Sequence, residues 1–387
     1  MVPEGWSQSA VGQCCNIKNN LRLPLNSDER KGMKGPYPYF GPTGILDHID
    51  HFRIDCEFAI IGEDGDHFLK HKEKEMTLIF SGKANVNNHA HIIIDSNLCL
   101  ARWFHLYFIH RDLTAHLTRQ GAKRYKLTKA GLEKLPILLP PVSEQNKITK
   151  ILSVWDQAIT TTETLLGNSQ QQKKALMQLL LTGRKRLSGF NIPWRKLPLT
   201  RYLLGSSLRN SGLTQGANEI MSVNKSEGMT PMRAETIGKS IERYKVVKPG
   251  WFAYNPMRIN VGSICRWAGK NDCLVSPDYV VFSCDEELLL GSYFDHFRQA
   301  EPWINFMRNA GNGSVRVRIY LDDLSLLKIP LPTLEEQEKI AAVLTTAEQE
   351  IKTLQTKLAC LKQEKKALMQ HLLTGKRRVK LDELEVA

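Results

Sequence analysis

The chain has 387 residues and a formal net charge of +13, and both figures limit its class. Because this length exceeds that of a typical domain, we expect two globular units of about 100 to 200 residues each. Hydrophobic residues make up 42% of the chain and charged residues 24%, which is ordinary for a globular protein and argues against disorder. The positive charge favours a polyanionic partner such as nucleic acid, although a basic, solvated surface has the same composition.

The sequence does not support a membrane protein, a secreted protein or a metal-dependent protein. No apolar run approaches the roughly 20 residues that span a bilayer, and the N-terminus lacks a basic region followed by an apolar core. The eight cysteines are scattered, without a Cys-x-x-Cys pair, so we expect neither a zinc cluster nor a disulfide framework. We therefore expect a cytoplasmic protein with reduced core thiols and no bound metal.

The first lobe, residues 1–134, is expected to mix strands and helices. It opens at Trp6, and its strand-like runs and one helical run are followed by a short strand near its end. In that strand the alternate residues Arg124 and Lys126 would share a face, which suits contact with phosphate. A solvated edge strand would use cations in the same way. The expected strands cover 58–61, 77–80 and 91–94, and the helix about 98–117.

A first helical spacer, residues 135–186, follows this lobe. Ser143 and Glu144 suit the positive end of a helix that begins after a proline-rich segment. The apolar positions then recur alternately four and three residues apart, which is the seam of a heptad repeat, interrupted by polar residues in its centre. Gly183 can take the left-handed conformation that ends a helix. The apolar seam residues are Ile148, Leu152, Trp155, Ile159, Leu166, Leu176 and Leu180, and the polar ones are Thr162, Ser169 and Lys173.

The second lobe, residues 187–326, has the same outline. It opens at Trp194, has strand-like runs at 251–254 and 279–282, and has a helical run over about 287–307. An offset of 192 residues places Arg124 and Lys126 of the first lobe on Arg316 and Arg318 of the second. We therefore expect a second cationic strand there.

A second helical spacer, residues 327–387, completes the chain and repeats the first. Its stop glycine is Gly375. The same offset of 192 residues aligns 137–148 with 329–340, and 173–178 with 365–370 as the identical run Lys-Lys-Ala-Leu-Met-Gln; about half of some 50 aligned positions are identical. The chain is thus a duplication of one lobe and one helix. The second seam is Ile340, Leu344, Ile351, Leu358, Leu368 and Leu372.

The order of lobes and helices predicts an α+β fold. The first helix delivers the chain to the second lobe and the second helix leaves it, so pairing of the two seams requires an antiparallel arrangement. We expect two mixed α/β domains separated by two long antiparallel helices that form an intramolecular coiled coil, with approximate two-fold symmetry. The alternative is a coiled coil that joins two chains.

The repeated Leu-Pro-rich segment with Glu-Gln-x-Lys-Ile, each copy after a divergent lobe, resembles the specificity subunit of Type I restriction-modification systems. Segments 37–44, 62–65 and 87–91 of the first lobe, and 254–264 and 276–279 of the second, add to this resemblance. It implies two target recognition domains that read a bipartite, gapped site in double-stranded DNA, with the helices setting the gap. It also implies two methyltransferase subunits and endonuclease/translocase subunits as partners, with S-adenosylmethionine and ATP bound only there and no cofactor on this chain.

Side-chain chemistry then suggests which residues contact DNA. Asparagine matches adenine, arginine forks to guanine, and lysine meets phosphate. Tyr39 could stack on a base or anchor its loop, and Asn87, Asn88 and Asn255 could instead satisfy local backbone groups. The candidates are Tyr39, Asn87, Asn88, His89, Arg119, Lys123, Arg124, Lys126, Asn255, Arg258, Ser276, Asp278, Tyr279, Arg316 and Arg318.

Signatures of an enzyme are missing from the sequence. Gly238-Lys239-Ser240 resembles the end of a phosphate-binding loop, but Arg233 stands where its first glycine belongs. The pairs His89 with His91 and His48 with His51 lack further ligands at metal-site spacing. We therefore expect a non-catalytic subunit. The competing hypothesis is a coiled-coil scaffold that assembles partners and binds no DNA.

Overall fold

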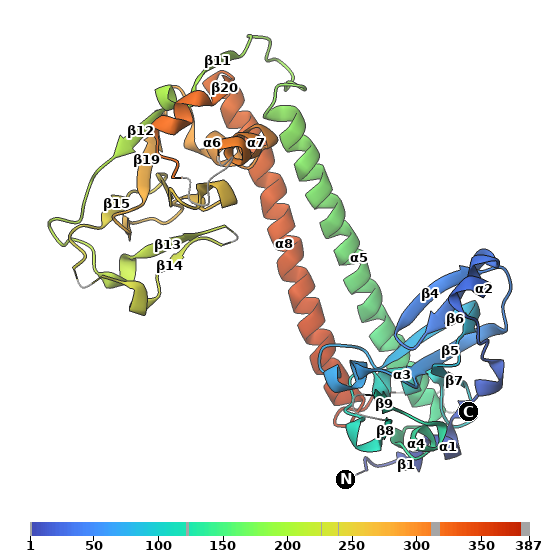
Figure 1. Cartoon of the computed structure of the whole chain (residues 1–387). Coiled ribbons are helices and arrows are strands. Elements are labelled where there is room, and N and C mark those ends of the chain that lie inside the picture. Colours follow the sequence, from blue (N-terminus) through green and yellow to red (C-terminus); the bar gives the residue numbers. More distant parts are fainter. Residues whose placement is uncertain (1, 121–123, 226, 239, 311–317, 381–387) are drawn as a thin grey trace. The chain divides into compact units, whose positions relative to one another are not determined.

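The computed structural model describes residues 2–120, 124–225, 227–238, 240–310 and 318–380 (Figure 1). The chain divides into two compact units. Unit 1 is Met1–Thr162 with Lys357–Ala387, and unit 2 is Glu163–Thr356. Each unit thus joins one lobe to parts of both long helices, and the narrower lobe limits expected above stay predictions. None of the helices in the described ranges is both long and apolar enough to cross a bilayer.

Six strands of unit 1 form one sheet in the order β2-β7-β5-β6-β3-β4, antiparallel except between β3 and β6. The apolar run in β5 points alternately to both faces. Ala59 and Ile61 pack with α3, while Phe58 and Ile60 pack in a second core on the other face. The strands are β2 (Asn16–Ile17), β3 (Lys34–Gly41), β4 (Gly44–Ile49), β5 (Ile54–Gly62), β6 (Thr77–Val86) and β7 (Ala90–Ile94).

Shorter elements close unit 1 around this sheet. Strand β1 (Ser7–Ala10) pairs with β10 (Pro136–Leu139) and so ties the start of the lobe to its end, and β8 (Thr118–Gln120) pairs with β9 (Arg124–Lys126). The short helices are α1 (Val11–Cys14), α2 (Ser27–Lys31), α3 (Ala101–Phe108) and α4 (Lys129–Glu133), with 3₁₀ turns at Asn19–Leu21, Asp66–Lys70 and Thr114–His116.

Unit 2 has a four-stranded antiparallel sheet in the order β12-β19-β16-β17, and strand pairs β13-β14, β15-β18 and β11-β20. Its strands are β11 (Arg195–Pro198), β12 (Leu203–Ser206), β13 (Met221–Asn224), β14 (Gly228–Pro231), β15 (Lys245–Val247), β16 (Phe252–Tyr254), β17 (Ile264–Arg266), β18 (Cys273–Val275), β19 (Val280–Cys284) and β20 (Lys328–Leu331). Its 3₁₀ turns are Leu199–Tyr202, Ala217–Glu219, Ala234–Thr236, Ile259–Val261 and Asp322–Leu326.

The lobe helices are shorter than expected. The run over 287–307 is split into α6 (Gly291–Phe297) and α7 (Glu301–Ala310), because Pro302 lacks an N–H and its ring would clash with the preceding helical turn. The run over 98–117 ends as α3 at Phe108. There Arg111 donates to the carbonyl of Tyr107, and Asp112 accepts from the backbone and hydroxyl of Thr114, so side chains replace the next helical turn.

The two long helices correspond residue for residue. Helix α5 spans Val142–Leu180 and α8 spans Leu334–Leu372, each of 39 residues. Both end just before the predicted stop glycines, which adopt left-handed backbone, with φ of 71° at Gly183 and 68° at Gly375. Two residues later the N–H of Lys185 reaches back to the carbonyl of Leu179, and that of Arg377 to His371, as left-handed helix caps do.

Every seam residue is buried or half-buried, whereas the opposite helix faces are exposed. Ion pairs give the direction of packing inside each unit. In unit 1 Asp156 pairs with Lys365, while Glu144, earlier in the chain, pairs with the later Arg378. In unit 2 Lys173 pairs with Glu348, while the later Arg186 pairs with the earlier Glu336, so within each unit the two helix segments run antiparallel. Together with the mixed lobes, this confirms the predicted fold class.

A buried glutamate near the start of each long helix fastens that end to its lobe. In unit 1 Glu144 accepts from Trp6 Nε1 at 3.1 Å and from Arg378 at 2.7 and 2.8 Å. In unit 2 Glu336 accepts from Trp194 Nε1 at 3.0 Å and from Arg186 at 2.6 and 2.7 Å. We call these groups of three the unit 1 latch and the unit 2 latch.

The glutamine that follows each latch glutamate explains the repeated Glu-Gln pair. Gln145 accepts from the N–H of Leu100 and donates to the carbonyls of Leu98 and Pro140. Gln337 makes the matching three bonds with Leu290, Leu288 and Pro332. Both Glu-Gln motifs therefore join a long helix to its lobe. The sequence analysis expected only a favourable charge at the start of the helix.

Candidate nucleic-acid interface

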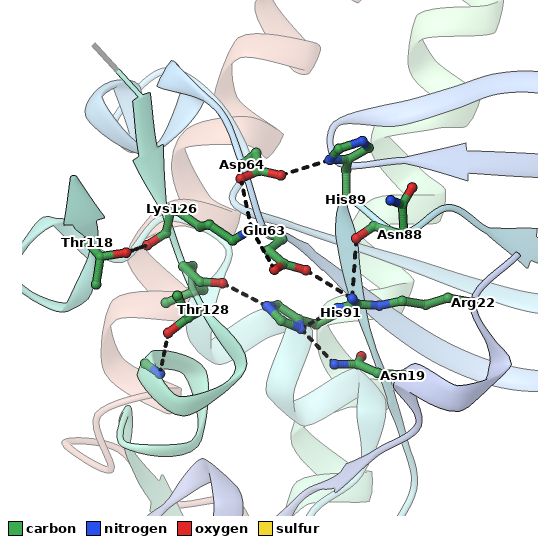
Figure 2. A network of polar contacts seen from close by, with 12 residues as sticks. Asn19, Arg22, Glu63, Asp64, Asn88, His89, His91, Thr118, Lys126 and Thr128 are labelled. Carbon is green, nitrogen blue, oxygen red and sulfur yellow. Dashed lines mark hydrogen bonds and ion pairs between the residues drawn. The ribbon is translucent and has the colours of Figure 1, made fainter. Parts of the chain in front are cut away.

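Three candidates of unit 1, Asn88, His89 and Lys126, gather where β5 ends beside the start of β7 (Figure 2). Because these strands are antiparallel and Gly62 pairs with Ala90, the residues after β5 meet those before β7. The N–H of Glu63 donates to the carbonyl of His89 at 2.8 Å, and an isolated bridge joins Asp64 to Lys126, the last residue of β9. Three segments distant in sequence thus form one polar cluster.

In the outer part of this cluster, the carboxylates of Glu63 and Asp64 pair with basic side chains. His89 Nδ1 lies 2.8 Å from Asp64, and both side chains are exposed. Lys126 Nζ lies 3.1 Å from Glu63 and 3.8 Å from Asp64, and Glu63 raises the pKa of Lys126. Since two carboxylates offset its charge, Lys126 is less suited to bind phosphate than the sequence suggested. Asn88 is exposed at the rim of the cluster.

The inner part of the cluster is structural. Arg22 donates to Glu63 at 3.0 Å and to Nδ1 of His91 at 2.6 Å, and Asn19 donates to the same nitrogen. His91 Nε2 must then carry the proton that it donates to the carbonyl of Leu127 at 2.8 Å. Burial lowers the pKa of His91. This neutral, fully paired ring holds the end of β9 beside β7.

Two candidates of the first lobe are anchors. Tyr39 is 0% exposed, and its hydroxyl donates to the carbonyl of Leu23 and accepts from the N–H of Leu25. Its ring cannot stack on a base, which corrects its place among the DNA contacts. Asn87 is also buried, and its side chain accepts from the N–H of His89. Asn87 therefore shapes the loop that presents its exposed neighbours.

The β8-β9 hairpin carries the other cations of this lobe. Arg119 is exposed, lies 5.3 Å from the Tyr125 ring and donates to the hydroxyl of that residue at 2.9 Å. Its guanidinium is thus oriented at the surface, where it can meet a phosphate or a base edge. Lys123 lies outside the described residues, as does the side chain of Arg124.

Four candidates of unit 2 line a cavity at the corresponding edge of its sheet. Tyr254 is the last residue of β16, pairs with Val280 at the start of β19, and corresponds by the offset of 192 residues to Gly62. A cavity of about 290 Å³ opens there. Its lining includes the predicted residues Asn255, Asp278, Tyr279 and Arg318, together with Lys245 and Tyr320, which the sequence analysis missed.

The polar groups that line this cavity differ in their hydrogen-bond partners and in their exposure. The Asn255 side chain accepts from the N–H of Met257 in a local turn, as the alternative interpretation proposed. Lys245 donates to the carbonyl of Tyr279 at 2.6 Å, and burial lowers the pKa of Lys245. Asp278 and Arg318 are exposed, so the cavity offers hydrogen-bonding groups of both charges.

The remaining candidates of unit 2 lie near this cavity in sequence. Arg258 is exposed, and its guanidinium makes no hydrogen bond or ion pair with any residue in the described ranges. Ser276 is half-buried, and its hydroxyl accepts weakly from the N–H of Asp278 at 3.5 Å. Arg316 lies outside the described residues. Arg318 belongs to no strand, which corrects the expected cationic strand at this position.

Some functional groups could be found from sequence and others could not. Glu63 and Asp64 lie in the Gly-Glu-Asp-Gly segment that contributed to the resemblance. Arg22 and Lys245 had no such signal, because they reach the site from other parts of the fold. In the described residues no group of three or more His, Cys, Asp or Glu side chains could hold a metal ion. Nδ1 of His51, one member of the His48 and His51 pair, lies 2.7 Å from the carboxylate of Asp50. Of the eight free cysteines, Cys56 and Cys360 are exposed, although the sequence analysis expected core thiols.

Comparison with known proteins decides the family. The family model described as Type I restriction modification DNA specificity domain matches residues 3–167 and 252–363, which is more than half of the chain. The chain belongs to this family. The resemblance seen in the repeated helices and divergent lobes is thereby confirmed, and the family supports a role in DNA sequence specificity.

Relatives extend this match over most of the chain. A putative type I restriction enzyme specificity subunit from Haemophilus influenzae is 26% identical over 343 residues, covering 86% of this chain and 85% of the relative. A putative type I restriction enzyme MjaX specificity subunit from Methanocaldococcus jannaschii is 25% identical, covering 98% and 95%. The crystal structure of an S subunit from M. genitalium has a similar fold, with a TM-score of 0.62 at 13% identity and coverage of 96% and 99%.

Proposed function

We propose that this member of the specificity family reads a bipartite, gapped site in double-stranded DNA. Each lobe would contact one half-site, and the chain itself would catalyse no reaction. Adenine methylation and DNA cleavage would belong to two methyltransferase subunits and to endonuclease/translocase subunits. S-adenosylmethionine and ATP would bind to those partners, and the assembly would work in the cytoplasm.

The observation that carries this proposal is the equivalence of the two candidate sites. The end of β5 in unit 1 and the end of β16 in unit 2 correspond by the offset of 192 residues. At both places polar loop residues gather at a sheet edge, yet the residues differ: His89 and Asn88 in one unit, Asp278 and Arg318 in the other. Two lobes with different contact residues on one repeated framework suit a DNA site whose two halves differ in sequence, because base edges are distinguished by donor and acceptor patterns.

Exposed cations would add sequence-independent affinity. Arg119 in unit 1 and Arg258 in unit 2 are accessible, and the net charge of +13 favours phosphate contacts. Within each unit the antiparallel helix segments continue the lobe core, through Ile148 in unit 1 and Ile340 in unit 2. We infer that the helices act as the spacer that sets the unread gap.

Mapping of methylated adenines tests the proposal. Genomic DNA from cells with and without this gene would be compared, and we expect a gapped motif that disappears when the gene is deleted. Electrophoretic mobility shifts of the chain with its methyltransferase subunit should show salt-sensitive, specific duplex binding. A complex that forms but never binds DNA specifically would support the scaffold hypothesis instead.

A further inference from the structure

The two units hold the sheet edge that carries their candidate DNA contacts by one shared backbone contact. In unit 1 the N–H of Leu127 donates to the carbonyl of Glu63 at 2.8 Å. In unit 2 the N–H of Ile319, 192 positions after Leu127, donates to the carbonyl of Pro256 at 3.1 Å. The repeated framework thus ties the chain segment after the lobe helices to the same sheet edge in both units. Unit 1 adds a side chain to this contact.

That side chain is His91 of β7, which is 0% exposed. Ile61 of β5 pairs with His91, and Ala253, 192 positions after Ile61, pairs with Val281 of β19. Val281 therefore occupies the position of His91 in the sheet of unit 2, where it is buried as well. An isopropyl group neither forms hydrogen bonds nor titrates. The two lobes consequently differ in the chemistry of one buried position beneath their candidate contacts.

His91 connects segments that are distant in sequence (Figure 2). Its Nε2 donates to the carbonyl of Leu127 at 2.8 Å, and its Nδ1 accepts from Arg22 at 2.6 Å. Arg22 also donates to the backbone carbonyl of Asn88 at 3.3 Å. The ring and the guanidinium together therefore join the segment after β9 to the loop that presents the exposed side chains of Asn88 and His89.

A second proton on the His91 ring would disrupt this network. Nδ1 would become a donor that faces the donors of Arg22 and Asn19, with no acceptor between them. Burial is the main cause that lowers the pKa of His91, and the nearby cations Arg22 and Lys126 lower it further. Glu63 and the hydrogen bond that the ring donates oppose this shift. The ring is therefore neutral at neutral pH, and it gains the disruptive proton only as the pH falls below the ordinary histidine value of 6.5.

His89, the other histidine of this cluster, would respond to acid in the opposite direction. It is exposed and its Nδ1 lies 2.8 Å from Asp64. A positive charge on this surface favours contact with phosphate, so protonation of His89 would strengthen DNA binding. A loss of binding in acid would therefore come from the buried ring.

We propose that His91 and Arg22 are positioning residues for DNA recognition by the first lobe, so that recognition of one half-site, and not the other, requires an uncharged histidine. This inference rests on the proposed function, because it concerns the two half-sites. Both residues act through the loop of Asn88 and His89 and through the segment after β9, which present the exposed groups. The second lobe reads its half-site without such a ring, since Val281 stands at that position.

The test measures discrimination at each half-site by the full chain with its methyltransferase subunit. The probes are duplexes that carry the methylated motif with both halves intact or with either half scrambled, and the ratio of the two affinities gives the discrimination. Effects of pH on phosphate contacts in general cancel in this ratio. For the native chain, discrimination at one half should fall about threefold or more between about pH 7.5 and about pH 5, and should stay constant at the other half.

Substitutions identify the ring as the source of this difference. His91→Val gives the first lobe the residue of the second, and should reduce discrimination about tenfold or more at the half that is sensitive to pH and leave the other half unchanged. Arg22→Met should weaken the same half. His91→Gln keeps an amide that can donate to the carbonyl of Leu127 and accept from Arg22, but cannot titrate. It should restore most of the discrimination and remove its dependence on pH.

A matched control and a measurement without DNA complete the test. His48→Val changes an exposed histidine of β4 and should behave as the native chain does. Nitrogen NMR of the histidine-labelled full chain at about pH 7 should show a neutral His91 ring with its proton on Nε2. A ring that is charged, or that carries its proton on Nδ1, would overturn the inference.

The binding data separate failure of this inference from failure of the proposed function. Native discrimination at both halves in His91→Val would contradict the positioning role alone. So would an equal pH dependence at both halves, or one that persists in His91→Gln. A native complex that discriminates at neither half would instead contradict the proposed function on which the inference rests.

Discussion

Glu144 and Glu336 are buried carboxylates, and each is stabilised by the indole that opens its lobe and by a guanidinium that follows the end of the other long helix. A buried charge is tolerated only when it is paired and hydrogen-bonded. Through the latches, the start of each long helix is stabilised by an arginine that follows the C-terminal end of the other long helix. Arg186 is the better test of this dependence, because its side chain is less exposed than that of Arg378.

Arg186→Ala should lower the free energy of unfolding of unit 2 by roughly 2 to 4 kcal/mol, because Glu336 would keep only the Trp194 hydrogen bond. Denaturant unfolding measures the change. Arg184→Ala removes an exposed arginine from the same segment and should have little effect. Adding Glu336→Gln to Arg186→Ala should recover part of the loss. Equal effects of the two arginine substitutions would show that the unit 2 latch contributes no stability.

His105 makes the stability of unit 1 depend on pH. Burial lowers the pKa of His105 to about 4, and its Nδ1 lies 3.0 Å from the Thr77 hydroxyl. That hydroxyl donates to the carbonyl of His105, so Nδ1 must carry a proton and donate to it, and burial favours the neutral tautomer that has its proton there. Because the folded pKa lies below the ordinary value of about 6.5, the unfolded chain binds more protons between these values, and stability falls as pH falls.

The loss attributable to His105 should reach roughly 3 kcal/mol between pH 7 and pH 4. His105→Asn keeps a donor near the Thr77 hydroxyl and cannot titrate, so its unfolding free energy should change less over this range. Urea unfolding at several pH values gives the comparison. His48→Asn changes an exposed histidine and should leave the native profile. Identical slopes for the native chain and His105→Asn would exclude this source of pH dependence.

At the scale of elements, the glycine caps determine where the long helices stop. Gly183 and Gly375 both adopt left-handed backbone, but their surroundings differ. A Cβ at Gly375 would lie 2.3 Å from Cγ of Pro3, whereas one at Gly183 would lie 3.2 Å from the Trp194 ring. The cap of α8 thus packs more tightly on the start of the chain than the cap of α5 packs on its own lobe.

Gly183→Ala should cost about 1 kcal/mol of stability from backbone strain alone, and Gly375→Ala should cost more because of the clash with Pro3. Thermal unfolding would rank the two variants. Gly167→Ala is the control, since Gly167 lies inside α5 with nothing within 4 Å of a new Cβ, and should stabilise the chain by up to about 1 kcal/mol. A Gly375→Ala variant as stable as Gly183→Ala would contradict the contact with Pro3.

The matched length of α5 and α8 leads to a prediction about the gap in the proposed DNA site. Deleting one heptad from each helix keeps both seams in phase and shortens each by about 10 Å, at 1.5 Å per residue. We expect the gap of the methylated motif to change while both half-sites stay the same. Deleting two residues from each helix would turn each seam by about 200° and should disrupt the pairing of the helix segments. Altered half-sites after the heptad deletion would refute the spacer role.

At the scale of the whole molecule, the duplication predicts that the two half-sites can be changed independently. Arg258→Ala in unit 2 should relax one half of the methylated motif, and His89→Ala in unit 1 should relax the other. Methylation mapping in cells that carry each variant measures both. Tyr39→Phe should leave the motif unchanged and reduce stability by about 1 kcal/mol, because Tyr39 is buried and only its hydroxyl contacts would be lost. One variant that altered both halves would contradict separate readers.

Local patterns were sufficient for much of the architecture. The apolar runs now found in β5, β6 and β7, and those in β16 and β19, identified strands because they alternate or cluster as buried strands do. The repeat at an offset of 192 residues established two equivalent halves. The heptad spacing and stop glycines located both long helices, because hydrogen bonds inside a helix depend on neighbours in sequence.

Only the tertiary structure decided which polar residues remain available for a ligand. Tyr39, Lys126 and Asn87 are all plausible contacts in the sequence, but burial, two carboxylates and a loop hydrogen bond occupy them. The latches and the unit 2 cavity likewise join residues more than 30 positions apart. The physical reason is that helix and strand formation follow periodicity along the chain, whereas burial and the pairing of charges depend on which distant segments meet when the chain folds.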